Sequence, residues 1–155
     1  MTMKPATPCI FCQIVQGELT PGVLAYCDNV TAVFPSRLQQ PRNRGHMLVL
    51  PVRHVAQIYE IEDDLAGPVM MALTRVAAAV KKVFAADGVS IRQNNEQAAG
   101  QDVFHLHFHV IPRFADDGFM ALDRSLGAIE VPIEARIDQA RKVGEAIRQL
   151  AGTTR

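Results

Sequence analysis

Residues 104–112, FHLHFHVIP, carry a histidine at every second position of an otherwise apolar run. Successive side chains of a β-strand point to opposite faces of a sheet, so this run predicts a strand over 103–112. One face of the strand would be buried in the core and would carry Phe104, Leu106, Phe108 and Val110. The other face would carry a row of three imidazoles about 6.5–7 Å apart, wide enough to flank a phosphate. These are His105, His107 and His109.

The rest of the chain predicts an α+β fold. Short apolar runs bounded by turn residues predict four more strands, at 23–27, 30–34, 46–51 and 89–93. Apolar residues at spacings of three and four predict a long helix over about 64–86. The same spacing predicts a C-terminal helix over about 133–150, with an apolar face that includes Ile137, Ala140, Val143 and Ile147. Because helices and strands do not alternate, we expect a largely antiparallel sheet of about five strands. Residues 36–44 are predicted as a loop, and 115–132 give no clear pattern.

Composition narrows the function. The 155 residues fit a single domain. Sixteen basic residues balance sixteen acidic ones, which argues against binding to nucleic acid or to an anionic membrane. No apolar run is long enough to cross a bilayer, and the first residues, MTMKPATP, lack the apolar stretch of a secretory signal. Three cysteines, an odd number, favour a reducing compartment, the cytoplasm. Cys27 lies in a predicted strand and is expected in the core.

The histidine row has two chemical interpretations. It could form an open zinc centre that activates water. Alternatively, one imidazole could attack phosphorus as a nucleophile while its neighbours assist. The second interpretation needs donors for phosphate oxygens, and the small-residue loop 98–102 supplies them: Gly100 permits close backbone approach and Gln101 adds a side-chain amide. The remaining histidines, His46 and His54, bracket the strand predicted at 46–51.

A second motif, Cys9-x-x-Cys12, is half of a structural zinc site. Two further ligands would have to come from distant parts of the chain. The alternatives are two buried free cysteines or a redox pair. A thioredoxin-like pair is expected in a βαβ setting, which this sequence does not predict.

Four blocks of the sequence resemble the histidine triad family. GQDVFHLHFHVIPR (100–113) resembles its signature, and GHMLVLPVRH (45–54) its second block. CIFCQIVQGE (9–18) is similar to the amino-terminal block of the zinc-carrying members, and NNEQAAGQ (94–101) also fits. The resemblance spans residues 9 to about 114 of a single domain over 1–155, with 115–155 as a C-terminal extension.

The resemblance implies a nucleotide hydrolase or nucleotidyl transferase. Its middle histidine attacks the α-phosphate of a purine nucleotide to give a nucleotidyl-histidine intermediate, and water then releases the monophosphate. The substrate would be a phosphoramidate, a dinucleoside polyphosphate or an adenylated compound. The positions that correspond to the family's site are His107 as nucleophile, His109 and Gln101 at the phosphate, His46 against the triad and Asn94 near the phosphates and sugar. An imidazole nucleophile must be neutral, and its other nitrogen should donate to a fixed acceptor such as a backbone carbonyl.

The resemblance also implies a closed structural Zn²⁺ site and a homodimer. The zinc ligands would be Cys9, Cys12, His54 and His105. The favoured dimer element is the long helix at about 64–86.

Two positions depart from the family pattern. The loop before His46 lacks the acid that binds ribose in many members. Either Gln39, Gln40 or a different geometry replaces it, or the arginines of the loop favour a more anionic substrate. Asp102 stands beside Gly100 in the substrate-binding loop, where many members have Ser or Thr, and an ionised carboxylate cannot donate to a leaving group. Two other functions stay open: a hydrolase with an open zinc site, and a nucleotide-binding regulator with little turnover.

Overall fold

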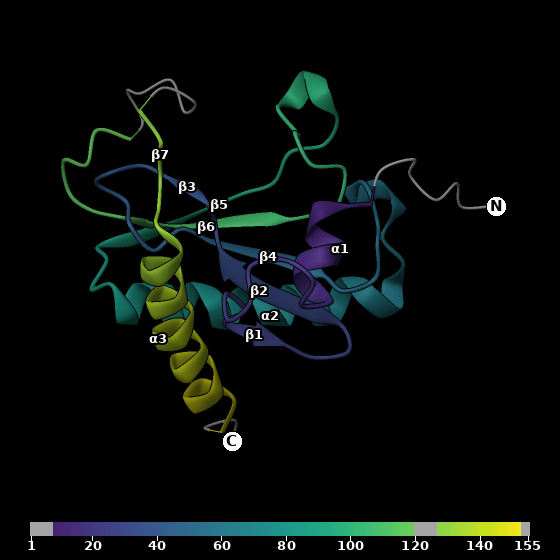
Figure 1. Ribbon diagram of the computed structural model, residues 1–155, viewed down its shortest axis with the longest axis horizontal. Coiled ribbons are helices and arrows are strands. Elements are labelled where there is room, and N and C mark those ends of the chain that lie inside the picture. Colours follow the sequence, from purple (N-terminus) through teal and green to yellow (C-terminus); the bar gives the residue numbers. More distant parts are fainter. Residues whose placement is uncertain (1–7, 120–126, 153–155) are drawn as a thin grey trace.

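A central antiparallel sheet organises the protein (Figure 1). The computed structural model describes residues 8–119 and 127–152. Five strands pair in the order β1-β2-β4-β6-β5, every pair antiparallel. Their bounds are β1 Tyr26–Cys27, β2 Thr31–Pro35, β4 Met47–Pro51, β5 Gly88–Arg92 and β6 Phe108–Arg113. The predicted α+β class and five-stranded antiparallel sheet are therefore confirmed.

Three α-helices surround the sheet: α1 Ile10–Val15, α2 Asp63–Val83 and α3 Ile133–Gly152. Two 3₁₀ turns, η1 Ile58–Glu60 and η2 Gln97–Ala99, lie in loops. The two long helices were predicted, whereas α1 was not, because its six residues are too few to show a helical period. In the described parts of the chain, no helix combines the length and apolar character needed to cross a membrane.

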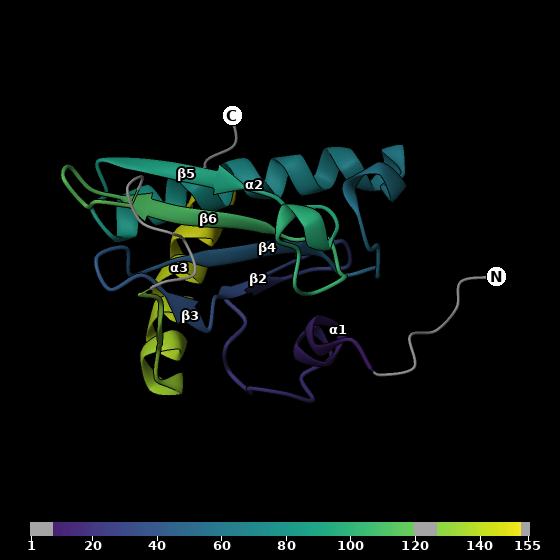
Figure 2. The ribbon, with the colours of Figure 1, turned by 90° about the horizontal axis from the view of Figure 1, so that it is seen from above.

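The two faces of the sheet are covered differently. Figure 2 shows α2 on one face and α1 on the other. The larger core lies on the α2 side, where residues of α2 and α3 meet inward side chains of β2, β4 and β6 such as Val33, Val49 and Val110. On the opposite face a smaller cluster joins Phe11 and Ile14 of α1 to Ala32, Phe34, Leu48 and Leu50. The thinner cover on the α1 face leaves room for a cavity.

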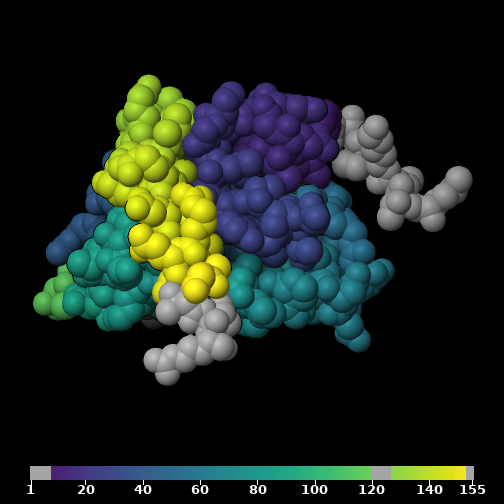
Figure 3. Space-filling view, turned by 90° about the horizontal axis from the view of Figure 1, so that it is seen from below, coloured from purple at the N-terminus to yellow at the C-terminus, as the bar shows by residue number. Residues whose placement is uncertain are grey.

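The C-terminal helix α3 packs closely against the edge of the sheet. In Figure 3 it runs in yellow alongside the indigo segment that contains β1 and β2. This approach requires Gly144, since a Cβ there would overlap the carbonyl oxygen of Ala25. The predicted apolar face is right at Ala140, Val143 and Ile147 but wrong at Ile137, which is 37% exposed and touches the turn at Gly22.

A second, two-stranded sheet pairs β3 Leu38–Gln39 with β7 Ile129–Glu130. The segment 36–44, predicted as a loop, thus includes a short strand whose partner lies in the stretch that gave no pattern. Gln39 reaches across to α3, where its amide pairs with that of Gln139 through hydrogen bonds of 2.9 and 3.2 Å. This pair holds the start of the 36–44 segment against α3.

Two further expectations are corrected. The predicted strand over 103–112 begins in the sheet only at Phe108, and Phe104 is 47% exposed rather than buried. Residues before Phe108 leave the sheet, and the amide of Leu106 bonds instead to the carbonyl of Val55. Cys27, expected in the core, is exposed because β1 is a two-residue edge strand with a single partner.

Candidate active site and metal centre

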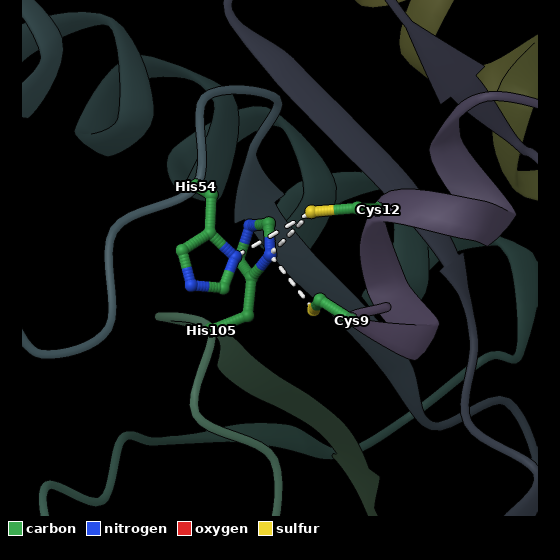
Figure 4. Close-up of side chains that lie close together, drawn as sticks. All are labelled: Cys9, Cys12, His54 and His105. Atoms are coloured by element: carbon green, nitrogen blue, oxygen red, sulfur yellow. Dashed lines mark hydrogen bonds between the residues drawn. The ribbon is translucent and has the colours of Figure 1, made fainter. Parts of the chain in front are cut away.

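Four side chains from three distant segments converge on one point (Figure 4). Cys9 precedes α1 and Cys12 lies in it, His54 follows β4, and His105 precedes β6. One ligand atom from each lies within 4.8 Å of all the others. Among the described residues, this is the one group of three or more His, Cys, Asp or Glu side chains arranged to hold a metal ion.

The spacing of these atoms fits tetrahedral zinc. Cys9 Sγ lies 3.5 Å from His105 Nδ1, and Cys12 Sγ lies 3.5 Å from His54 Nδ1 and 3.6 Å from His105 Nδ1. With usual Zn–S and Zn–N bond lengths, a sulfur and a nitrogen on one tetrahedral ion lie about 3.5–3.6 Å apart. The three separations are therefore those of edges of a coordination tetrahedron.

The surroundings of the cluster also fit a cation. His105 Nε2 donates to the carbonyl of Pro51 at 2.8 Å, which leaves the lone pair of Nδ1 directed at the sulfurs. Burial and the neighbouring Cys9 raise the pKa of Cys12 to about 11, so a thiolate at this position needs a positive charge beside it. The donor set is that of a closed structural Zn²⁺ site with no open coordination position.

His107 has the geometry of an imidazole nucleophile. Its Nδ1 donates to the carbonyl of His105 at 2.7 Å, so Nε2 carries the free lone pair. The side chain lines a cavity, and the ring of Phe11 packs edge-on against it at 5.1 Å between centroids. Burial lowers the pKa of His107 below its ordinary value of 6.5, which keeps the ring neutral at pH 7. The expected backbone acceptor for its second nitrogen is present.

His46 and His109 form a pair beside His107. His46 Nε2 and His109 Nδ1 lie 2.9 Å apart, a hydrogen bond in which one neutral ring donates to the other. The rings of His107 and His109 are 4.9 Å apart. Burial lowers the pKa of both His46 and His109, and the positive charge of Arg92 lowers both further. All three rings are thus neutral donors or acceptors near pH 7.

A cavity of about 690 Å³ opens over these histidines. This volume is in the range that holds a nucleotide-sized ligand. Its wall joins a mainly apolar region, which includes residues of α1 and β2, to the histidines and the loop after β5. Six of the predicted site residues line it: His46, Asn94, Gly100, Asp102, His107 and His109.

Comparison with known proteins identifies the family. Residues 18–116 match the HIT domain. This range overlaps most of the span of the sequence blocks, which begin at residue 9 and end at about 114. The chain belongs to the HIT domain family. It is 38% identical over 121 residues to Protein hit of Bacillus subtilis, covering 77% of this chain and 81% of that protein. It is 34% identical over 106 residues to adenosine 5′-monophosphoramidase hnt1 of Schizosaccharomyces pombe, covering 68% of this chain and 74% of that one.

A solved structure supports the fold of this HIT domain. The zinc-bound histidine triad family protein from Mycobacterium smegmatis superimposes with a TM-score of 0.74 at 29% identity. The match covers 94% of this chain and 97% of that protein.

The loop after β5 brings backbone groups to the cavity of the HIT domain. Gly100 has a φ of +87°, a left-handed conformation that favours glycine, and its carbonyl accepts from Asn94 Nδ2 at 3.4 Å. Asp102 is exposed and lines the cavity, and its charge partly opposes the effect of burial on the pKa of His107.

Gln101 is placed differently from the other predicted site residues. It is 3% exposed, and its Nε2 donates to the carbonyls of Ala56 at 2.8 Å and Val103 at 3.1 Å. Its Oε1 accepts from the amide of Glu96. Gln101 therefore fixes the shape of the loop. Its side chain could contact a phosphate directly only if these hydrogen bonds were broken.

Sequence reasoning missed several residues of the cavity wall. Phe11 comes from the unpredicted helix α1, while Arg37, Arg92 and Arg136 come from three separate segments. The arginines of 36–44 were noted as a group, but nothing in the sequence shows that Arg136, far along the chain, lies in the same wall. Only the packing of α3 against the sheet brings it there.

Proposed function

We propose that this HIT domain hydrolyses or transfers nucleotides by attack at the α-phosphate, through a nucleotidyl-His107 intermediate. One observation carries the proposal: the hydrogen bond from His107 Nδ1 to the His105 carbonyl leaves Nε2 as a neutral nucleophile at the cavity. The relative named as an adenosine 5′-monophosphoramidase supports a purine nucleotide with a substituted phosphate. Phosphoramidates, dinucleoside polyphosphates and adenylated compounds all satisfy this description.

The reaction has two steps. In the first, the Nε2 lone pair of His107 forms a bond to the α-phosphorus while the bond from phosphorus to the leaving nitrogen or oxygen breaks. The leaving atom keeps the electron pair and takes a proton from solvent. In the second, water attacks the same phosphorus and gives up a proton to solvent, the bond between phosphorus and Nε2 breaks, and Nε2 regains its lone pair as the monophosphate leaves. The protein contributes mainly position and charge stabilisation.

The neighbouring groups have defined tasks in this scheme. His109, which lines the cavity, can donate one N–H to a phosphate oxygen, while His46 fixes its orientation. Arg92, also in the wall, supplies positive charge near this pair. The first step makes the His107 ring cationic, and the carboxylate of Asp102 stabilises that form, since its charge already raises the pKa of His107. Asn94 and Gly100 line the cavity, where they would meet the phosphates and sugar.

Zinc bound by Cys9, Cys12, His54 and His105 would act as a structural cross-link. It would hold α1 against the segment that leads into β6, and with it Phe11, whose ring packs against both His105 and His107. A reducing compartment such as the cytoplasm suits this site because Cys9 and Cys12 must remain thiols to bind the ion.

The protein is also proposed to form a homodimer. β5 is an edge strand of the five-stranded sheet, and Ile91 on it is 49% exposed. On the neighbouring helix α2, Met70 is 55% exposed. An open strand edge flanked by apolar side chains is a natural pairing surface. Light scattering should report a dimer that Ile91→Lys converts to a monomer; a monomeric wild type would refute this part of the proposal.

The open zinc site is the less favoured alternative. His105 is engaged with Cys9 and Cys12, and His46 is paired with His109, so the histidine row does not form one ligand set. A regulator without turnover is distinguished by experiment, because it would bind nucleotide but form no covalent adduct.

Trapping the intermediate tests the proposal. The protein is incubated with adenosine 5′-phosphoramidate, quenched in alkaline denaturant because the P–N bond is acid-labile, and digested with trypsin. Tandem mass spectrometry should find adenylate on the peptide 93–113, at His107. The His107→Asn variant should give no adduct. Turnover that persists in His107→Asn, or wild-type turnover without an adduct, would refute the mechanism.

A further inference from the structure

The charged side chains of the cavity wall fall into two groups. Apart from the histidines, the charged residues that line the cavity in the described parts of the chain are Arg37, Arg92, Arg136 and Asp102. Arg92 and Asp102 act on the catalytic histidines, as the pKa values of His46, His109 and His107 show. Arg136 is affected by other groups instead: burial lowers its pKa, Glu130 raises it and Arg37 lowers it. The cavity therefore has a second cationic region beside its catalytic end.

Arg136 is a buried charge with unused donors. The residue is 8% exposed, and in the described chain its side chain makes one hydrogen bond, from Nε to the carbonyl of Val131 at 3.2 Å. Within the same residues, neither Nη1 nor Nη2 has a hydrogen bond or an ion pair. Four of the five N–H groups of this guanidinium therefore remain available to a ligand in the cavity that Arg136 lines. An anion in the cavity would accept from them.

Arg37 and Thr20 complete the second cationic region. Arg37 pairs with Glu130 at 3.2 Å across the β3–β7 sheet, and its carbonyl accepts from the amide of Val131. Glu130 offsets one of the two guanidinium charges, which leaves a net positive charge there. The hydroxyl of Thr20, also in the cavity wall, is buried and makes no hydrogen bond. All three residues thus line the cavity and carry N–H or O–H donors.

The position of Arg136 places this region on the nucleoside side of the cavity. Ile133, one helical turn earlier in α3, packs against the apolar cluster that contains Phe11, Phe34 and Leu48. Those three residues also form part of the apolar wall of the cavity. If the scissile phosphate lies at His107, as in the proposed function, the nucleoside extends over this wall toward Arg136.

We propose that Arg136, Arg37 and Thr20 form a second anion subsite, which selects nucleotides that carry an additional phosphate or carboxylate on the ribose or base. This inference uses the proposed function only to decide which end of the substrate lies at His107. The guanidinium of Arg136 forms paired N–H···O bonds to the added anion, and Arg37 and Thr20 contribute charge and a hydroxyl.

Binding of stable nucleotides tests the subsite without requiring turnover. Calorimetry compares adenosine 5′-monophosphate with three probes: adenosine 3′,5′-bisphosphate, adenosine 2′,5′-bisphosphate and adenylosuccinate, which has carboxylates on the base. At least one probe should bind wild type about tenfold tighter or more than the monophosphate, as expected for charge-assisted hydrogen bonds. The probe that binds more tightly shows whether the subsite recognises an anionic group on the ribose or on the base.

Variants assign the gain to its residues. Arg136→Gln should abolish the affinity ratio between that probe and the monophosphate, Arg136→Lys should keep part of it, and Arg37→Gln should reduce it. Arg141→Gln is the matched control, because Arg141 is an exposed arginine of the same helix paired with Asp138, and it should keep the full ratio. Equal or weaker binding of all three probes by wild type, or a ratio unchanged in Arg136→Gln, would overturn the inference. If wild type shows the expected affinity ratio but forms no covalent adduct at His107, the proposed mechanism is refuted and the proposed subsite is still supported.

Discussion

His105 and His107 are two residues apart in one histidine row, but they keep different ring nitrogens free and so suit different chemistry. Each ring makes one hydrogen bond to a backbone carbonyl, but through different nitrogens. His105 uses Nε2 to bond Pro51 and presents Nδ1 to two cysteines, whereas His107 uses Nδ1 to bond His105 itself and presents Nε2 to the cavity. The backbone carbonyl that accepts from each ring determines which ring nitrogen keeps a free lone pair. That free nitrogen in turn determines what each histidine can bind or attack.

The difference depends on where the chain leaves the sheet. Residues before Phe108 are not paired as a strand, so His105 can turn toward α1 while its carbonyl turns toward His107. Leu106 stays fully buried on the opposite side, which preserves the alternation of faces without a strand. The Cys/His cluster thereby holds the carbonyl that accepts from His107, the proposed nucleophile. Loosening the cluster should therefore disturb His107, but a change at His107 should leave the cluster intact.

The largest expected effect separates the two histidines. His107→Asn should lower kcat by about 10⁴-fold or more, because no other group can form the covalent intermediate. It should leave zinc content and melting temperature close to wild type. His105→Asn should lose zinc, and its melting temperature should fall below that of wild type. Steady-state kinetics, metal analysis and calorimetry measure these outcomes; loss of zinc in His107→Asn would contradict the separation.

The next effect concerns the metal cluster alone. Cys12→Ser should release zinc and cost about 2–5 kcal/mol in free energy of unfolding, because metal binding contributes directly to folding. Cys27→Ser is the control, since Cys27 is an exposed thiol outside the cluster, and its effect should be within about 0.5 kcal/mol. Denaturant unfolding with and without chelator gives both values. Equal stability of the two variants would show that the cluster holds no structural ion.

A smaller effect follows from pH. Burial lowers the pKa of His46, His107 and His109 below 6.5, so at acidic pH the unfolded chain binds more protons than the folded one. Stability is therefore full above about pH 6.5 and falls as the pH drops below this value. His46→Asn should reduce the slope by at most about 1.4 kcal/mol per pH unit. Unfolding between about pH 7.5 and 5 measures it; an unchanged slope would mean that His46 is protonated in the folded state.

The smallest effect tests the end of the strand. Phe104→Ser should change the free energy of unfolding by less than about 0.5 kcal/mol, because the side chain is 47% exposed. Phe108→Ala, four residues later and buried, should cost about 3–5 kcal/mol. Equal costs for the two phenylalanines, measured by denaturant unfolding, would place Phe104 in the core after all.

Local patterns in the sequence determined much of this protein. The period of two at residues 105–109 separated the core face from the histidine face, and the spacing of three and four located α2 and α3 to within a few residues. Cysteine spacing predicted half of the ligand cluster that the fold assembles, and the resemblance to the histidine triad family supplied His54 and His105. These features succeeded because a side chain's direction follows from its own strand or helix.

Tertiary structure alone decided the rest, because the deciding partner of each group lies far along the chain. The free nitrogen of His105 depends on Pro51, and Gln101 is withdrawn from the cavity by Ala56. Arg136 enters the cavity wall because α3 packs against the sheet, nearly a hundred residues after Arg37. A sequence shows which donors and charges exist, but their free lone pairs and N–H groups are settled by which carbonyls and carboxylates the fold brings beside them.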